Sequence, residues 1–274
     1  MLRKFNYLSP TTEEELLKFL AKHMGKAKLL AGGTNLFVDM RSDLLKPEYV
    51  IDIKKVPGVK EIKFLSRVGL SIGPGVTCNE LIECKAVEEK YPLLIAAAKE
   101  LASYQIRNRA TVAGNICYAS PAADMAPALL ILGAKVKIAS IAGEDIIPLK
   151  DFFKGVKKTL LQPEEFVKAL IIPEDYSFMK ALYKKSKRVK GHDLSIVSVA
   201  MGRIKGFYRI AIGSCGPTPV LLEEIPVTVE LKEIISKALK AISPIDDLRG
   251  SADYRRNMVE VYIKRIHQEL GGKN

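Results

Sequence analysis

The fold of this chain is decided by the stretch Arg107-Asn108-Arg109-Ala110-Thr111-Val112-Ala113-Gly114-Asn115-Ile116-Cys117-Tyr118-Ala119-Ser120-Pro121-Ala122-Ala123-Asp124. Two arginines precede a turn of small residues, and Ser-Pro and an aspartate then lead into an apolar helical run. Small residues let the main chain approach a ligand closely, because little side chain stands in the way. Consecutive free N–H groups in such a turn form a concavity that suits phosphate. Taken alone, the stretch is more typical of an ordinary surface loop, so a second phosphate loop is needed to make it informative.

The composition is that of a globular protein. A chain of 274 residues can form one large domain or a few small ones. It is 48% hydrophobic and 27% charged, which is ordinary for such proteins. No apolar run reaches the roughly 18 residues of a membrane span, and the segment 1–7 lacks the apolar region of a secretory signal. We therefore expect a cytoplasmic protein without a transmembrane segment.

The formal net charge of +12 raises the question of nucleic-acid binding. Basic residues are, however, spread along the chain and mixed with acidic ones. The densest basic run, 184–190, has no interleaved aromatic residues on which bases could stack. Such a run is more typical of a solvated hairpin, a surface for an acidic partner or a phosphate-facing patch. We expect no nucleic-acid partner.

The cysteines and histidines show no metal-binding pattern. No C-x-x-C motif occurs, and no histidine lies at zinc-finger spacing from a cysteine. Reduced structural thiols and no bound metal are therefore expected. The residues concerned are Cys78, Cys84, Cys117, Cys215, His23, His192 and His267.

A second glycine turn lies near the N-terminus. The short apolar segment 27–30 runs into Gly32-Gly33, and Thr34-Asn35 then opens a short helical segment. A strand, glycine turn and helix in this order present N–H groups to an anion. Thr34 is a natural N-cap residue for the helix. The pattern is not G-x-G-x-x-G, so it does not predict a nicotinamide site.

The final third of the sequence changes character. Four segments read as consecutive strands, separated by glycine turns, and two helices follow. A meander followed by a helix pair predicts an α+β fold, with a domain boundary near Pro173. The turn Pro57-Gly58 is predicted to separate two lobes before that boundary. The strands are predicted at 166–172, 181–185, 194–201 and 208–212, and the helices at 231–242 and 252–270.

The two glycine motifs, in this order, resemble the FAD-binding medium subunit of the molybdenum hydroxylases. That family includes the carbon monoxide dehydrogenase medium chain and the flavin domain of xanthine dehydrogenase. The resemblance covers essentially the whole chain, and 251–256 resembles the family's C-terminal domain. It implies a two-lobed FAD-binding (PCMH-type) domain over residues 1–172, with lobes 1–57 and 58–172. An α+β domain with an antiparallel three- to four-stranded sheet and a helix pair is expected over 173–274.

Site residues follow from the resemblance, position by position. The first loop, expected to wrap the FAD pyrophosphate with main-chain N–H groups, comprises Ala31, Gly32, Gly33, Thr34, Asn35 and Leu36. In the second loop, Thr111, Gly114 and Asn115 match, and the hydroxyl and amide are expected to bond phosphate oxygens. Ala113 replaces a glycine that is frequent there, which adds strain only if the position needs positive φ.

Three further side chains are implied near the flavin. Tyr118 falls on the flavin side of the second loop. Asp124 is expected to accept hydrogen bonds from FAD hydroxyls, as an acceptor-only carboxylate can. Lys184 falls near a family lysine at the isoalloxazine ring, where a cation would stabilise reduced flavin; Lys185 and Arg188 compete for this role.

The resemblance implies no catalytic residue on this chain. A molybdenum-cofactor large subunit would oxidise the substrate, and a [2Fe–2S] small subunit would relay electrons to FAD and on to an external acceptor. The expected assembly is a dimer of heterotrimers. The scattered cysteines give no sign of the additional iron–sulfur cluster that some relatives carry.

Several alternatives stay open at this point. One is a self-standing FAD-dependent oxidase or reductase, for which His192 and Cys117 are the only nearby candidates for covalent flavin attachment. Another is a basic binding module without a cofactor. Arg107 and Arg109 could either brace the second loop or meet a partner subunit.

Overall fold

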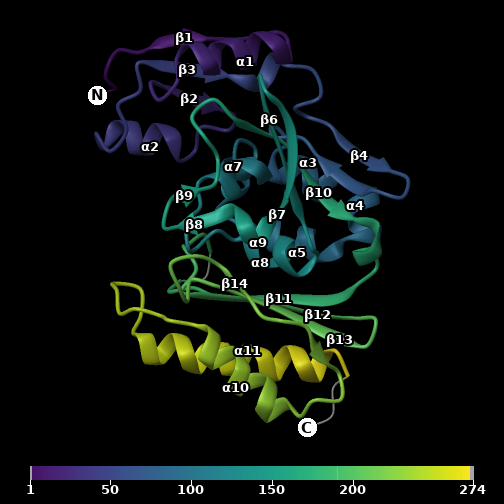
Figure 1. The fold of residues 1–274 in the computed structure, drawn as a ribbon. Coiled ribbons are helices and arrows are strands. Elements are labelled where there is room, and N and C mark those ends of the chain that lie inside the picture. Colours follow the sequence, from purple (N-terminus) through teal and green to yellow (C-terminus); the bar gives the residue numbers. More distant parts are fainter. Residues whose placement is uncertain (1, 190, 272–274) are drawn as a thin grey trace.

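The structure is a computed structural model that describes residues 2–189 and 191–271. Three larger sheets follow one another along the molecule, from the N-terminal lobe through a larger central lobe to a C-terminal sheet backed by helices (Figure 1). The predicted α+β class is confirmed.

The first lobe is built on a three-stranded parallel sheet with β3 in the centre. Its strands are β1 (Asn6–Leu8), β3 (Tyr49–Asp52) and β2 (Ala27–Leu30), followed by the 3-10 helix η1 (Ile53–Lys55). Helix α1 (Glu13–Lys22) begins at Thr12, whose hydroxyl accepts from the Glu15 N–H at 3.1 Å. The Glu15 carboxylate accepts from the N–H of Thr11 rather than of Thr12, so a Thr12–Glu15 capping box is only half formed. Helix α2 (Leu36–Arg41) follows β2.

The central lobe contains a five-stranded antiparallel sheet. In spatial order its strands are β4 (Ile62–Leu65), β5 (Gly69–Ile72), β10 (Phe166–Pro173), β6 (Lys135–Ser140) and β7 (Gly143–Pro148). The helices are α3 (Cys78–Glu83), α4 (Lys85–Lys90), α5 (Pro92–Lys99), α6 (Tyr104–Arg107), α7 (Val112–Cys117), α8 (Met125–Ile131) and α9 (Leu149–Phe152). A short hairpin of β8 (Phe153–Gly155) and β9 (Lys158–Thr159) follows α9.

Strand β10 shows where the first of the four predicted strands lies. The segment 166–172 precedes the predicted boundary near Pro173, and β10 pairs with β5 and β6 in the central sheet rather than with the meander strands that follow it. This pairing joins segments far apart in the sequence, and a local hydrophobic pattern carries no information about it. The 3-10 helix η2 (Glu174–Tyr176) then leads to the C-terminal sheet.

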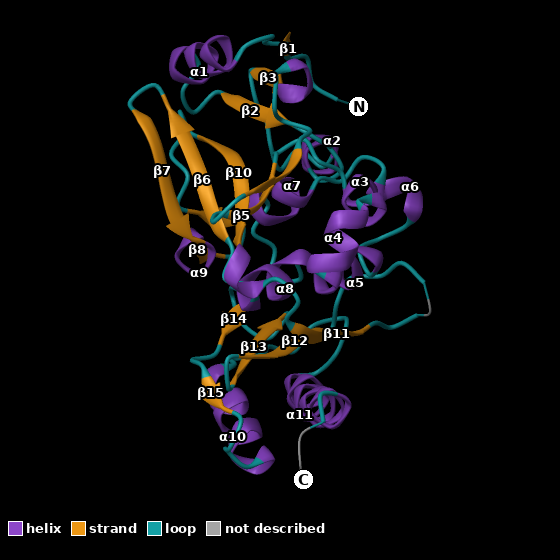
Figure 2. Ribbon diagram, turned by 90° about the vertical axis from the view of Figure 1, so that its right-hand side faces the viewer, coloured by secondary structure: helices purple, strands orange, loops and turns teal. Residues whose placement is uncertain are grey.

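The C-terminal sheet is an antiparallel meander. It consists of β11 (Lys180–Ser186), β12 (Val197–Ile204), β13 (Phe207–Gly213) and β14 (Val220–Leu221), and β15 (Ile225–Pro226) also pairs with β13. The predicted helix pair is present as α10 (Leu231–Ala241) and α11 (Ala252–Glu269). Helices α5 and α8 contact one face of this sheet and α11 the other (Figure 2). Alternate side chains of β11 therefore point into different layers.

Candidate functional site

The two glycine loops lie against each other. A Cβ built on Gly32 would fall 1.9 Å from the carbonyl oxygen of Arg109 and 3.2 Å from Cα of Ala110. Only a residue without a side chain can approach another main chain this closely. The tertiary structure thus brings the first loop onto the start of the second, as a common phosphate site requires.

The first loop presents a row of unused N–H groups. Among the described residues, no protein acceptor is found for the main-chain N–H groups of the segment 32–36. Gly33 has φ +78°. Successive N–H groups in such a turn form an anion-binding concavity.

Thr34 is not the N-cap of α2, so that prediction is wrong. Asn35 holds the N-cap position without a side-chain cap bond. A capping Thr34 hydroxyl would have to accept a hydrogen bond from the Phe37 N–H. That N–H donates instead to the Gly33 carbonyl at 3.1 Å. The glycine turn itself therefore begins the helical hydrogen-bond ladder.

The second loop is held by side-chain bonds that leave donors available. Thr111 caps α7, and its Oγ1 accepts from the Gly114 N–H at 2.9 Å, which leaves the hydroxyl proton free to be donated. Asn115 Oδ1 accepts from the Met125 N–H at 3.2 Å, which leaves its NH₂ group as a donor. Ala113 lies within α7 and is not among the residues with positive φ, so the missing glycine adds no strain.

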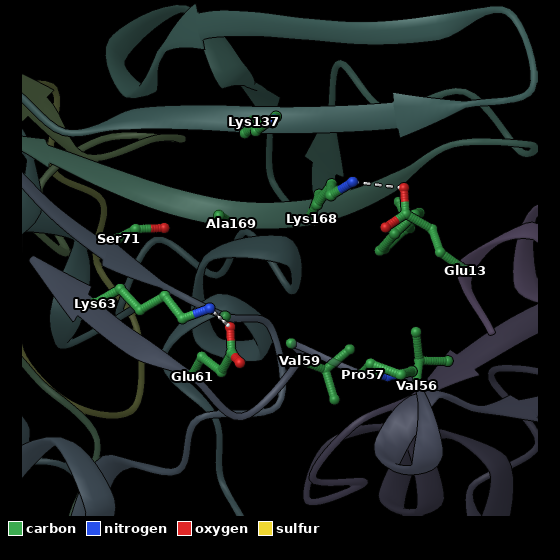
Figure 3. Close-up of a pocket in the computed structure, with 13 residues that line it drawn as sticks. Glu13, Val56, Pro57, Val59, Glu61, Lys63, Ser71, Lys137, Lys168 and Ala169 are labelled. Atoms are coloured by element: carbon green, nitrogen blue, oxygen red, sulfur yellow. Dashed lines mark hydrogen bonds and ion pairs between the residues drawn. The ribbon is translucent and has the colours of Figure 1, made fainter. Parts of the chain in front are cut away.

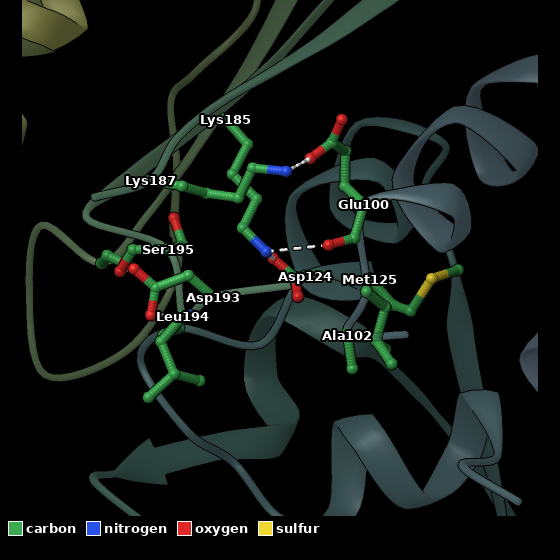
Figure 4. A network of polar contacts seen from close by, with 12 residues as sticks. Glu100, Ala102, Asp124, Met125, Lys185, Lys187, Asp193, Leu194 and Ser195 are labelled. Atoms are coloured by element: carbon green, nitrogen blue, oxygen red, sulfur yellow. Dashed lines mark hydrogen bonds and ion pairs between the residues drawn. The ribbon is translucent and has the colours of Figure 1, made fainter. Parts of the chain in front are cut away.

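Asp124 lies in a buried network between α8 and the C-terminal sheet (Figure 4). Its carboxylate is 2.8 Å from Lys185 Nζ, and Lys185 also donates to the Glu100 carbonyl at 2.9 Å. Lys187 pairs with the Glu100 carboxylate at 2.8 Å. Burial raises the pKa of Asp124 to about 6, although the neighbouring Lys185 opposes that rise. An ionised Asp124 would be an acceptor for hydroxyl donors.

The structure does not bring Lys184 to the two loops. Lys184 lies on the opposite face of β11 from Lys185 and pairs with Glu269 of α11 at 2.6 Å. Arg188 pairs with Asp193. The basic run is therefore largely neutralised within the chain rather than solvated, and its residue 190 lies outside the described residues.

Arg107 braces the second loop. Its guanidinium donates from Nη1 to the carbonyls of Lys99, Leu101 and Ala102 at 3.2, 2.9 and 3.2 Å, and from Nε to Asn79 Oδ1 at 3.2 Å. Arg109 is exposed, and its side chain makes no hydrogen bond within the described part of the chain. The two arginines therefore have different roles.

Three side chains beside the loops were not predicted from the sequence. Lys54 donates to the Ala31 carbonyl at 3.4 Å and pairs with Asp52 at 2.7 Å. Asp39, buried in α2, accepts from the Tyr118 hydroxyl at 3.3 Å. In the sequence, Asp39 and Asp52 are recognisable only as single charged residues within apolar segments. That signal does not indicate which side chains they contact.

A separate cavity lies away from these loops, between α1 and the central sheet (Figure 3). Its volume is about 170 Å³. Its three lysines are each paired with a glutamate: Lys168 with Glu13 at 2.6 Å, Lys63 with Glu61, and Lys137 with Glu144, which lies just outside the lining. With these pairs counted, the cavity has no surplus of positive charge for an anionic ligand.

The cysteines and histidines contribute no visible site. Burial raises the pKa of the Cys117 thiol to about 12, which disfavours it as a nucleophile for flavin attachment. Within residues 2–189 and 191–271 no group of three or more potential metal ligands occurs. No helix in the same ranges is long and apolar enough to cross a membrane.

Two glycine turns that meet at Gly32 and Arg109 and leave a row of unpartnered N–H groups suit a nucleotide phosphate, and a sheet backed by two helices follows them in the chain. A family profile described as "FAD binding domain in molybdopterin dehydrogenase" matches residues 3–175, and "CO dehydrogenase flavoprotein C-terminal domain" matches residues 181–270. The chain belongs to this family of FAD-binding domains in molybdopterin dehydrogenases. The predictions of FAD as cofactor and of a molybdenum-hydroxylase flavoprotein subunit are confirmed.

Individual relatives are similar over their whole length. The glyceraldehyde dehydrogenase medium chain of Sulfolobus acidocaldarius is 31% identical, with 97% of this chain and 98% of the relative covered. The carbon monoxide dehydrogenase medium chain of Hydrogenophaga pseudoflava is 29% identical over 96% and 95%. The solved carbon monoxide dehydrogenase of Hydrogenophaga pseudoflava superposes with a TM-score of 0.91 at 28% identity, covering 98% of this chain and 97% of the other.

Proposed function

We propose that this chain receives electrons from [2Fe–2S] clusters of a small partner subunit and passes them to an external acceptor, while a molybdenum-cofactor large subunit oxidises the substrate. The names of its relatives, which are medium chains of dehydrogenases, support this division of labour. Bound FAD supplies the electron-accepting and electron-releasing chemistry.

The chain's own residues bind and orient the cofactor. The N–H groups of the segment 32–36 suit the pyrophosphate, and the free hydroxyl proton of Thr111 and NH₂ group of Asn115 suit its outer oxygens. Asp124 suits cofactor hydroxyl groups. The observation that carries the proposal is the contact of Gly32 with Arg109, because it unites both loops in one cradle.

The lysine proposed to lie nearest the isoalloxazine ring changes from Lys184 to Lys185. Lys184 remains a candidate from the resemblance, but its pairing with Glu269 favours a role in joining β11 to α11. Lys185 is better situated, since it lies beside Asp124 on the face toward the FAD-binding lobes. Tyr118 is proposed to lie on the flavin side of the second loop, where its hydrogen bond to Asp39 would hold it in place.

We also propose the finer organisation. The FAD-binding domain would span residues 1–172, with lobes 1–57 and 58–172, and the second domain 173–274. The whole would assemble in the cytoplasm as a dimer of heterotrimers. The separate profile matches to 3–175 and 181–270 support the division near Pro173.

Purification of the chain from its native host tests the proposal. We expect a complex that contains FAD, molybdenum and iron, and cluster-dependent flavin reduction. A lone chain that oxidises its own substrate would favour a self-standing oxidase or reductase. A colourless chain that takes up no FAD on reconstitution would leave only a basic binding module.

A further inference from the structure

Three side chains connect the two flavin loops to a third segment. Asp39 belongs to α2, directly after the first loop, and Tyr118 is the residue at the end of α7 in the second loop. Lys157 lies in the turn between β8 and β9, far from both in the sequence. We call these three residues the loop clamp.

The clamp is centred on one buried carboxylate oxygen. The Tyr118 hydroxyl donates to Asp39 Oδ1 at 3.3 Å, and Lys157 Nζ lies 3.5 Å from the same atom. The ammonium group also lies 4.7 Å from the centre of the Tyr118 ring, within the range of a cation–π interaction. The Asp39 side chain is only 9% exposed and that of Lys157 is 47% exposed, so the attraction is partly shielded from solvent on the carboxylate side.

The main chain reinforces the clamp at a cost. The Lys157 N–H donates to the Ala119 carbonyl at 2.9 Å. Both residues have left-handed backbones, with φ +54° for Lys157 and +48° for Ala119. Residues other than glycine persist in this conformation only where their surroundings impose it. Glycine would adopt this backbone conformation without strain. The lysine therefore occupies the position at a backbone cost that the contacts of its side chain can offset.

Asp39 transmits the constraint to the first loop. Its N–H bonds to the Asn35 carbonyl at 2.9 Å, and its own carbonyl accepts from Leu44 at 2.9 Å. The position of the Asp39 carboxylate is therefore coupled to that of the free N–H groups of the segment 32–36. Gly32 and Arg109 form a second, separate contact between the loops, and two separated contacts constrain their relative orientation.

We propose that Lys157 is a positioning residue, which holds the first flavin loop against the second and thereby sets the affinity of the cradle for FAD. The inference rests on the proposed function, because the ligand is the same cofactor. No contact between Lys157 and the cofactor is required.

The test compares substitutions at two adjacent lysines in the full chain. Lys157→Gly relieves the left-handed backbone and removes the side chain, Lys157→Met keeps the stem without the charge, and Lys157→Arg keeps the charge. Lys158→Met is the matched control, because Lys158 is exposed and follows directly in β9. FAD affinity is measured by fluorescence quenching, thermal unfolding is followed without FAD, and amide exchange is followed over the segment 32–41.

We expect Lys157→Gly to unfold no earlier than the wild type, yet to bind FAD at least about tenfold more weakly. Lys157→Met should show the same weakening and faster amide exchange over 32–41. Lys157→Arg should recover most of the affinity, and Lys158→Met should match the wild type. A purely structural turn would instead lose stability and affinity together.

The inference fails if the Gly and Met variants bind FAD like the wild type, or if Lys158→Met weakens binding equally. In both cases the wild type still binds FAD, and the proposed function stands. A wild type that binds no FAD would overturn the proposed function and the clamp together.

Discussion

Lys185 Nζ lies 2.8 Å from the carboxylate of Asp124, and the two side chains are 0% and 8% exposed. This ion pair ties β11 of the C-terminal sheet to the start of α8, directly after the second glycine loop. A buried pair of this kind is weak evidence for stability but a strong constraint on geometry, because removing one partner leaves an uncompensated charge.

Asp124 should give stability a specific pH dependence. Its folded pKa, about 6, lies above its ordinary value, so the folded state retains a proton that the unfolded chain releases. The contribution of this group to the free energy of unfolding is therefore present at low pH and is lost as pH rises from about 4 to about 6. The loss should amount to about 1–3 kcal/mol at about 1.4 kcal/mol per pKa unit.

Urea unfolding of the wild type and Asp124→Asn at pH 4, 5, 6 and 7 checks this. Carboxylates with lowered pKa, such as Asp247, change stability in the opposite sense but do so equally in both proteins. The wild-type minus variant difference should fall across the window. A difference that is flat with pH would contradict the buried, proton-retaining state of Asp124.

Gly32→Ala should separate the two loops. The new Cβ cannot stay 1.9 Å from the Arg109 carbonyl oxygen, so one main chain has to move. We expect a loss of about 1–3 kcal/mol in stability and a clear fall in FAD content after purification. Gly25→Ala is the control, since it has positive φ but nothing within 4 Å. It should lose about 1–2 kcal/mol and keep its FAD, and equal FAD loss in both variants would argue against a specific contact.

Arg107→Met and Arg109→Met should behave differently. The first leaves the carbonyls of Lys99, Leu101 and Ala102 without their donor, at a cost of about 1–3 kcal/mol. The second removes an exposed side chain and should change stability by less than about 0.5 kcal/mol. Chemical denaturation measures both. If Arg109→Met nevertheless weakens assembly with the partner subunits, its role lies at their interface.

Gly114→Val should lower FAD affinity by at least about tenfold. Gly114 is exposed on the second loop, and a Cβ there would already lie 2.7 Å from Thr111 Oγ1. The variant therefore fills the ligand side of the loop and also disturbs the helix cap. Thr111→Val removes the cap of α7, which should lower stability by about 1 kcal/mol, and adds no bulk toward the ligand. Thr111→Ser keeps the cap. FAD titration of all three variants separates crowding from cap loss, and full flavin content in Gly114→Val would remove the second loop from the site.

Local features of the structure were predictable where local chemistry determines them. Thr77 and Glu80 form both bonds of a capping box at α3, and Gly133 has φ +61° just after α8, as their spacing predicts. The alternation along 181–185 predicts that Lys184 and Lys185 lie on opposite faces of a strand. It does not predict which face meets the flavin lobes, because that depends on which helices cover the sheet.

The sequence by itself determined the α+β class, the two glycine motifs and their order, since these follow from local periodicity, turn residues and the family resemblance. The tertiary structure alone decided that β10 belongs to the central sheet and that Lys185 rather than Lys184 reaches Asp124. It also decided that Gly32 packs against the main chain of Arg109 and that Lys157 contacts Asp39 and Tyr118. All of these are contacts between segments distant in the chain. Their geometry is set by how sheets and helices pack, which no local pattern of residues records.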